Sequence, residues 1–128
     1  FPYRHLHRDV VALIGAGRSR CYVGHYRPDE PNVAVDAKLV DRKWFFDNQP
    51  SDVVICGEMV SELSSSLRDL LTKTCQVISE PAPTRHAASM AAIGFKKLKS
   101  SNTTPLSDVE PIYLKSSQIT SVLKRWSA

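Results

Sequence analysis

The sequence predicts an α/β domain built on a mixed five-stranded sheet. Three strand-like runs, Val10–Ile14, Cys21–Tyr26 and Val33–Val40, precede any long helical stretch. Helical and strand-like segments alternate after them. Val10–Ile14 is fully apolar, which is typical of a central strand covered on both faces. Cys21 and Val23 share one face of the second run with His25, because side chains alternate along a strand.

The segments that follow are predicted from the spacing of their apolar residues and from their turn residues. Asp41–Asp47 is expected to be a short helix with Asp41 as its N-cap and with Trp44 and Phe45 facing inward. The later elements are expected in the order strand Val53–Cys56, one helix from Met59 to about Thr74, strand Gln76–Ser79 and a helix capped by Thr84.

The last predicted long helix has apolar residues at helical spacing, so that face is expected to be buried against the sheet. Its members are Ala87, Met90, Ala91, Phe95 and Leu98. Val109–Lys115 is expected to be extended and to pin the end of the chain to the domain, with Leu114 packed inside. Ile119–Trp126 is expected to form a final short amphipathic helix.

This order of elements, βββαβαβα, is the order of a ribonuclease-H-like core, which also forms each half of the actin-like ATPase fold. Active versions of such a core hold magnesium with carboxylates, since this cation prefers oxygen ligands. Here the first strand carries no acid, and Asp9, Asp36 and Glu58 are scattered along the chain. We therefore expect a domain without catalytic residues, metal or cofactor.

Length and composition indicate one ordinary globular domain over residues 1–128, with 42% hydrophobic residues and a net charge of +4. No apolar run approaches the roughly 20 residues that span a bilayer, and we expect a cytoplasmic location. Cys21, Cys56 and Cys75 have no metal-binding spacing and are expected to be buried and reduced. Because the chain begins at Phe1, we expect it to be a piece of a longer protein.

The candidate site residues each have a structural alternative. Gly15, Gly17 and Arg18 could form a phosphate-facing hairpin, or only a turn between strands. His25 could be a ligand and His86 a base, but neither has an acid or a second histidine at ligand spacing. Ser64–Ser66 is interpreted as a polar helix surface.

Aromatic and basic side chains raise the question of RNA binding. Four aromatic residues could stack on bases or could simply pack in the core; they are Tyr22, Tyr26, Trp44 and Trp126. Three lysines at the end of the last long helix could contact phosphates or could complement the helix dipole; they are Lys96, Lys97 and Lys99.

The C-terminal end carries the most informative motif. Pro111-Ile112-Tyr113-Leu114-Lys115 is similar to the P-x-Y-L-[RK] signature that closes TsaB (YeaZ-like) proteins. Earlier segments resemble the family in the same order: the hairpin Ala16–Tyr22, the strand-to-glycine turn Val54–Glu58 and the proline-led helix start Pro83–Ala87. The resemblance covers the family's C-terminal half. Gly15 departs from it, because the family has aspartate there.

The resemblance implies a function in making threonylcarbamoyladenosine on tRNA. TsaB proteins are non-catalytic members of a glycoprotease-like family with the actin-like ATPase fold. A TsaD-like catalytic subunit would be the main partner, a TsaE-like ATPase could join through the full-length protein, and a homodimer is possible. Contact with tRNA would be indirect. The alternatives are a basic RNA-binding domain and a degenerate glycoprotease-like hydrolase.

Overall fold

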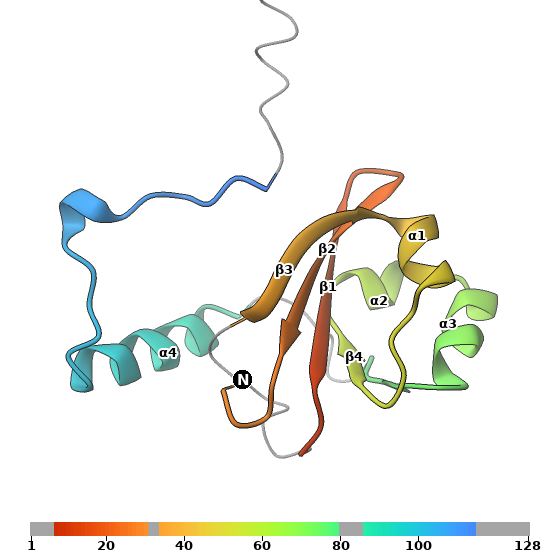
Figure 1. Cartoon of the computed structure of the whole chain (residues 1–128), viewed down its shortest axis with the longest axis horizontal. Helices are drawn as coiled ribbons and strands as arrows, with labels where there is room; N and C mark the ends of the chain where they lie inside the picture. Colours follow the sequence, from red (N-terminus) through yellow and green to blue (C-terminus); the bar gives the residue numbers. More distant parts are fainter. Residues whose placement is uncertain (1–6, 31–33, 80–85, 115–128) are drawn as a thin grey trace, which may run out of the picture.

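The computed structural model describes residues 7–30, 34–79 and 86–114 of the chain. Its elements follow the predicted alternation of strands and helices (Figure 1). The strands are β1 (Val10–Ala16), β2 (Arg20–Tyr26), β3 (Ala34–Asp41), β4 (Val54–Cys56) and β5 (Gln76–Val77). The helices are α1 (Arg42–Asp47), α2 (Met59–Glu62), α3 (Ser65–Thr72), α4 (Ala87–Lys99) and the 3₁₀ turn η1 (Leu106–Asp108).

The described strands form one five-stranded sheet in the order β3-β2-β1-β4-β5. The pairs β1–β2 and β2–β3 are antiparallel, whereas β1–β4 and β4–β5 are parallel. Only β2 therefore runs against the other four strands. The prediction of an α/β class with a mixed five-stranded sheet is confirmed.

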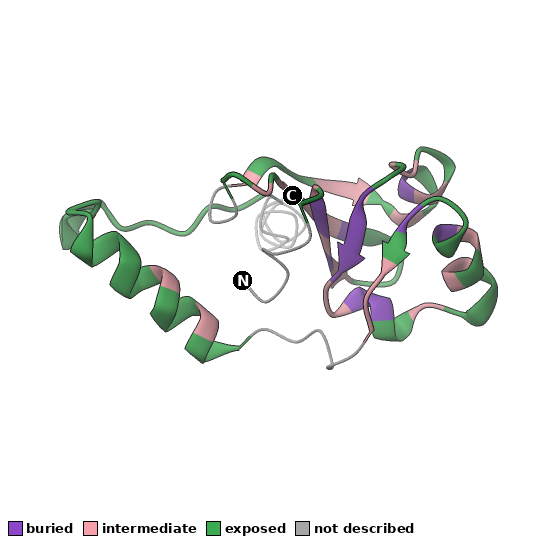
Figure 2. Ribbon diagram, turned by 90° about the horizontal axis from the view of Figure 1, so that it is seen from below, coloured by how far each residue is buried: buried purple, intermediate pink, exposed green. Residues whose placement is uncertain are grey.

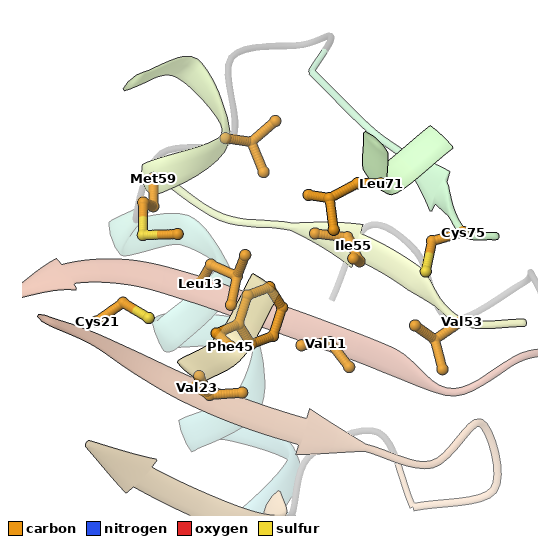
Figure 3. Close-up of a cluster of buried hydrophobic side chains, with 11 residues drawn as sticks. Val11, Leu13, Cys21, Val23, Phe45, Val53, Ile55, Met59, Leu71 and Cys75 are labelled. Atoms are coloured by element: carbon orange, nitrogen blue, oxygen red, sulfur yellow. The ribbon is translucent and has the colours of Figure 1, made fainter. Parts of the chain in front are cut away.

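One face of the sheet packs against α1, α2 and α3 and forms the larger core (Figures 1 and 3). Leu13, Ile55 and Cys21 are fully buried on this face, and Val23 lies beside them. Helix α1 contributes Phe45, which is 2% exposed. The predicted shared face of Cys21 and Val23 is therefore confirmed.

The opposite face of the central strands is buried as well. Val10, Val54 and Cys56 form a second cluster there, and Tyr26 packs against it. Strand β1 thus contributes Val11 and Leu13 to one core cluster and Val10 to the other. This arrangement confirms the prediction of a central strand covered on both faces.

Two details of the helices on the covered face correct the predictions. The segment expected to be one helix from Met59 to about Thr74 is two, because Leu63 adopts an extended conformation (ψ 136°). Ser64 then caps α3, its hydroxyl oxygen accepting a hydrogen bond from the backbone N–H of Leu67 at 3.4 Å. Serine favours such a cap over a helix interior. Asp41 is the N-cap of α1, as predicted, but makes no side-chain capping bond.

The aromatic pair of α1 was predicted to face inward together, and only half of that prediction is correct. Phe45 is buried, but Trp44 is 46% exposed. The two residues are adjacent, and neighbouring positions on a helix do not share a face.

Helix α4 is the largest departure from the predictions. Its expected buried face is exposed, with Met90 at 73%, Phe95 at 59% and Leu98 at 63%. Figures 1 and 2 place α4 on the side of the sheet opposite α1–α3, and no residue of α4 is buried. Helical periodicity identifies an apolar face, but it does not say what covers that face.

The stretch after α4 is also exposed. Leu114, predicted to pack inside, is 43% exposed, and Ile112 is 88% exposed. Val109 to Leu114 has no regular secondary structure. Thr84 and the segment Ile119–Trp126, for which a cap and a helix were predicted, lie outside the described residues.

Position 57, directly after β4, requires glycine for two reasons: its backbone conformation and the close approach of a neighbouring strand. Its φ is +111°, and a Cβ there would lie 2.2 Å from the carbonyl oxygen of Leu13. We predict that Gly57→Ala destabilises the domain by at least about 3 kcal/mol, because strain and a backbone clash add. Urea unfolding followed by circular dichroism would measure this change.

Gly17 provides the matched control for this prediction. Its φ is also positive, +77°, but no atom lies within 4 Å of its Cβ position. Gly17→Ala should therefore cost only about 1–2 kcal/mol, the strain of a left-handed residue. Equal losses for the two variants would contradict the close approach of Gly57 to β1.

Candidate functional site

The β1–β2 hairpin contains the glycines and the arginine that the sequence singles out. Gly17, Arg18 and Ser19 form the loop between β1 and β2, and Gly17 uses the positive φ expected of a turn glycine. Arg18 is exposed on this loop. Gly15 lies within β1, opposite Cys21.

The guanidinium group beside this hairpin comes from Arg42 at the start of α1. Its Nη2 donates to the carbonyl oxygen of Gly17 at 3.0 Å, and its Nε donates to that of Arg20 at 3.1 Å. Nη2 also pairs with Glu62 Oε2 at 3.2 Å. The backbone N–H of Arg42 donates to Ser19 O at 2.8 Å. Arg42 therefore joins the hairpin, α1 and α2.

Gly15 leaves room for this arginine. A Cβ at Gly15 would lie 2.9 Å from Arg42 Nη2 and 3.3 Å from Glu62 Oε2. The space that a side chain would take at this position is thus already taken by the ion pair. No local sequence pattern indicates this role of Arg42, because 25 residues separate it from Gly17 and only the folded sheet brings them together.

His25 has an acidic partner that sequence spacing did not reveal. Its Nε2 lies 2.6 Å from Asp9 Oδ2, and both side chains are a little over one-third exposed. Asp9 precedes β1 by one residue and lies two residues from Val11, which is the register partner of His25. The antiparallel register of β1 and β2, which no local sequence pattern specifies, explains the contact between Asp9 and His25.

The acids considered for metal binding lie at different places. Asp36 in β3 pairs with Lys38 at 3.2 Å and lies opposite His25 in the β2–β3 register. Glu58 follows the C-terminal end of β4, whereas Asp9 precedes β1, which is parallel to β4. Glu58 and Asp9 are therefore at opposite ends of the sheet. Among the described residues, no three His, Cys, Asp or Glu side chains gather as metal ligands would.

The three cysteines are free and buried, as predicted. Burial raises the pKa of the Cys56 thiol to about 11. Burial also raises the pKa of Cys21, with Arg42 acting in the opposite direction. The raised pKa keeps the Cys56 thiol protonated near neutral pH. Because the thiolate is the nucleophilic form, Cys56 is unreactive there.

The aromatic candidates do not form one stacking platform. Tyr26 packs against the cluster on the face of the sheet that Val10 and Cys56 share. Trp44 lies on the helix-covered face, with Lys38 Nζ 5.1 Å from its ring centroid. Tyr22 is half-buried in β2, and Trp126 lies outside the described residues.

The remaining polar candidates lie on the surface. The three lysines, Lys96, Lys97 and Lys99, occupy the exposed last turn of α4 as predicted. His86 is the exposed residue before α4. Ser64–Ser66 spans the cap and the first turn of α3 and is exposed.

The C-terminal motif lies on the surface too. Pro111 and Tyr113 are exposed, Tyr113 at 81%, and Lys115 lies outside the described residues. No helix in the described part of the chain is long and apolar enough to cross a membrane. No protein-family model matches the sequence, and no curated protein matches it significantly.

The bonds of Arg42 lead to a stability prediction. Arg42→Ala should destabilise the domain by about 1–3 kcal/mol, because it removes charge-assisted bonds to two carbonyl groups and leaves Glu62 without this partner. Thermal and urea unfolding would measure the loss. The control is Arg18→Ala in the same hairpin, which should change stability by less than about 0.5 kcal/mol. Similar small effects for both variants would contradict the role assigned to Arg42.

Proposed function

We propose that this chain is the C-terminal, ribonuclease-H-like domain of a TsaB-type protein. The observation that carries the proposal is the strand order β3-β2-β1-β4-β5 with only β2 reversed. A three-strand meander that continues into two parallel strands is the arrangement that a ribonuclease-H-like core implies. An actin-like ATPase fold contains two such halves, and this chain would supply the second.

The positions of the motif residues support the proposal. The segment Val54–Glu58 resembles the strand-to-glycine turn of the family. At its Gly57, the backbone of Leu13 leaves no space for a side chain. The P-x-Y-L segment follows α4, and Pro111 and Tyr113 lie on the surface. An exposed motif at the end of the chain is available to contact another domain or subunit.

A role in assembly suits the charged groups of this domain better than catalysis does. Arg42 directs its guanidinium to the hairpin's own carbonyls and to Glu62. Asp9 and Glu58 lie at opposite ends of the sheet, and Cys56 keeps its proton. These groups do not converge on one point where a reacting atom could sit.

The proposed role is to complete a two-lobed, cytoplasmic protein that supports a TsaD-like catalytic subunit. That subunit would carry the metal and nucleotide chemistry of threonylcarbamoyl transfer to adenosine in tRNA. A TsaE-like ATPase would join the full-length assembly, and this domain would meet tRNA only indirectly.

The proposal is tested in the source organism by depleting the protein that contains this chain. The threonylcarbamoyladenosine content of digested tRNA, measured by mass spectrometry, should fall at least about tenfold relative to other modified nucleosides. Complementation with the unaltered gene is the control and should restore the content. Unchanged threonylcarbamoyladenosine after complete depletion would overturn the proposal.

Unfolding and subunit-capture measurements test the surface motif. A Tyr113→Ala, Leu114→Ala double variant should cost less than about 1 kcal/mol of stability, because both side chains are at least 43% exposed. It should nevertheless lower capture of the TsaD-like subunit.

Tight RNA binding by this chain at physiological salt, lost when the three lysines of α4 are changed to alanine, would favour the RNA-binding alternative.

A further inference from the structure

A small cavity lies between the sheet and α1, away from the β1–β2 loop. Its volume is about 160 Å³, and its apolar lining comes from Val11, Val23, Phe45 and Val53. These four side chains belong to the core cluster on the helix-covered face (Figure 3). Trp44, which is 46% exposed, also lines the cavity.

Polar groups line one side of this cavity. His25 of β2 and Asp36 of β3 are direct register partners, and both contribute to the lining. Asp9, the residue before β1, lies 2.6 Å from His25 Nε2 through its Oδ2. Lys38 completes this side, pairing with Asp36 and lying over the ring of Trp44. An apolar floor with a few convergent polar groups is the usual composition of a binding pocket.

The size of the cavity limits what it can hold. Pockets for whole small-molecule ligands have volumes of about 300–1,000 Å³, whereas a cavity of about 150 Å³ holds a benzene-sized group. A cavity of about 160 Å³ is therefore suited to a single ring that belongs to a larger molecule.

The charges around the cavity limit the kind of ring. Asp36 in the lining and Asp9, which pairs with His25, place two carboxylates beside the cavity, against the ammonium group of Lys38 and the imidazole of His25. Phosphate groups would be repelled by the carboxylates, which disfavours a nucleotide base as the bound ring. A neutral ring that donates a hydrogen bond is favoured, because Asp36 offers acceptor oxygens. A tyrosine side chain has both properties.

The adjacent strand indicates how such a side chain would be presented. Strand β3 is one of the two outer strands of the described sheet, so one row of its backbone N–H and C=O groups faces outward. Asp36 and Lys38 lie on β3 and line the cavity. An extended peptide that pairs with this edge would gain main-chain hydrogen bonds, with a pocket for one of its side chains.

We propose that the outer edge of β3 and the cavity beside it bind an extended segment of a partner protein, with one tyrosine side chain inserted between Trp44, His25 and Asp36. Backbone pairing supplies part of the affinity, and the ring supplies selectivity. This site is on the body of the domain and is separate from the C-terminal motif considered above.

The first experiment uses p-cresol, the side chain of tyrosine, as a probe of the isotope-labelled chain by NMR. A ligand of this size should bind with a dissociation constant on the order of 1 mM. The signals of Val23, Asn48 and the Trp44 indole should shift. Toluene, which lacks the hydroxyl, should bind about fivefold more weakly. Equal binding of toluene, or tighter binding of p-cresyl phosphate, would overturn the assignment of a neutral donor ring.

Two variants localise the binding. Trp44→Ala and Asp36→Ala should each weaken p-cresol binding by about fivefold or more. Both side chains are substantially exposed, so the fold should survive, and circular dichroism checks this. Val35→Ala is the control on the same strand: Val35 is exposed and alternates away from Asp36. Loss of binding in the control, or unchanged binding in both variants, would contradict the site.

The second experiment tests the strand edge with a synthetic peptide of alternating valine and threonine around one central tyrosine. It should bind at least about tenfold more tightly than p-cresol and should shift the amide signals of β3 from Asp36 to Val40. The same peptide with alanine in place of tyrosine should bind more weakly. A tyrosine peptide that binds no better than p-cresol, without shifts along β3, would overturn the proposed strand pairing.

Discussion

Strand β1 is the element on which the rest of the structure depends, because it is paired on both edges and buried on both faces. It pairs with β2 in antiparallel and with β4 in parallel orientation. Its side chains supply Leu13 to one core cluster and Val10 to the other. Gly57 brings the end of β4 against the backbone of Leu13, where no other residue type fits. A change in the position of β1 would therefore disturb every layer of the domain.

Charged groups organise the two ends of the helix-covered face without entering its core. At one end Arg42 holds the β1–β2 hairpin to α1 and α2. At the other end, His25, Asp36 and Lys38 line a cavity beside the edge strand β3, and Asp9 pairs with His25. Both groups make internal bonds, and His25, Asp36 and Lys38 of the second group also line the cavity.

The predictions that succeeded rest on local patterns, and those that failed rest on partners distant in sequence. The apolar run Val10–Ile14 and the alternation of Cys21 and Val23 are enough to predict a central strand and its neighbour. The contacts of Arg42 with Gly17 and of His25 with Asp9 depend on strand register, which no local pattern specifies. Helix α4 shows the same limit: its periodicity predicts a helix, and its exposed Phe95 shows that periodicity does not predict a partner.

Hydrogen exchange measured amide by amide would test most directly the claim that β1 and β4 form the stable centre of the domain. Exchange free energies range from near zero for locally opening segments up to the global stability. The amides of Val11, Leu13 and Ile55 should exchange only by global unfolding. Those within α4, which buries no residue, should exchange on the order of a hundredfold faster or more. Protection in α4 equal to that in β1 would contradict this account.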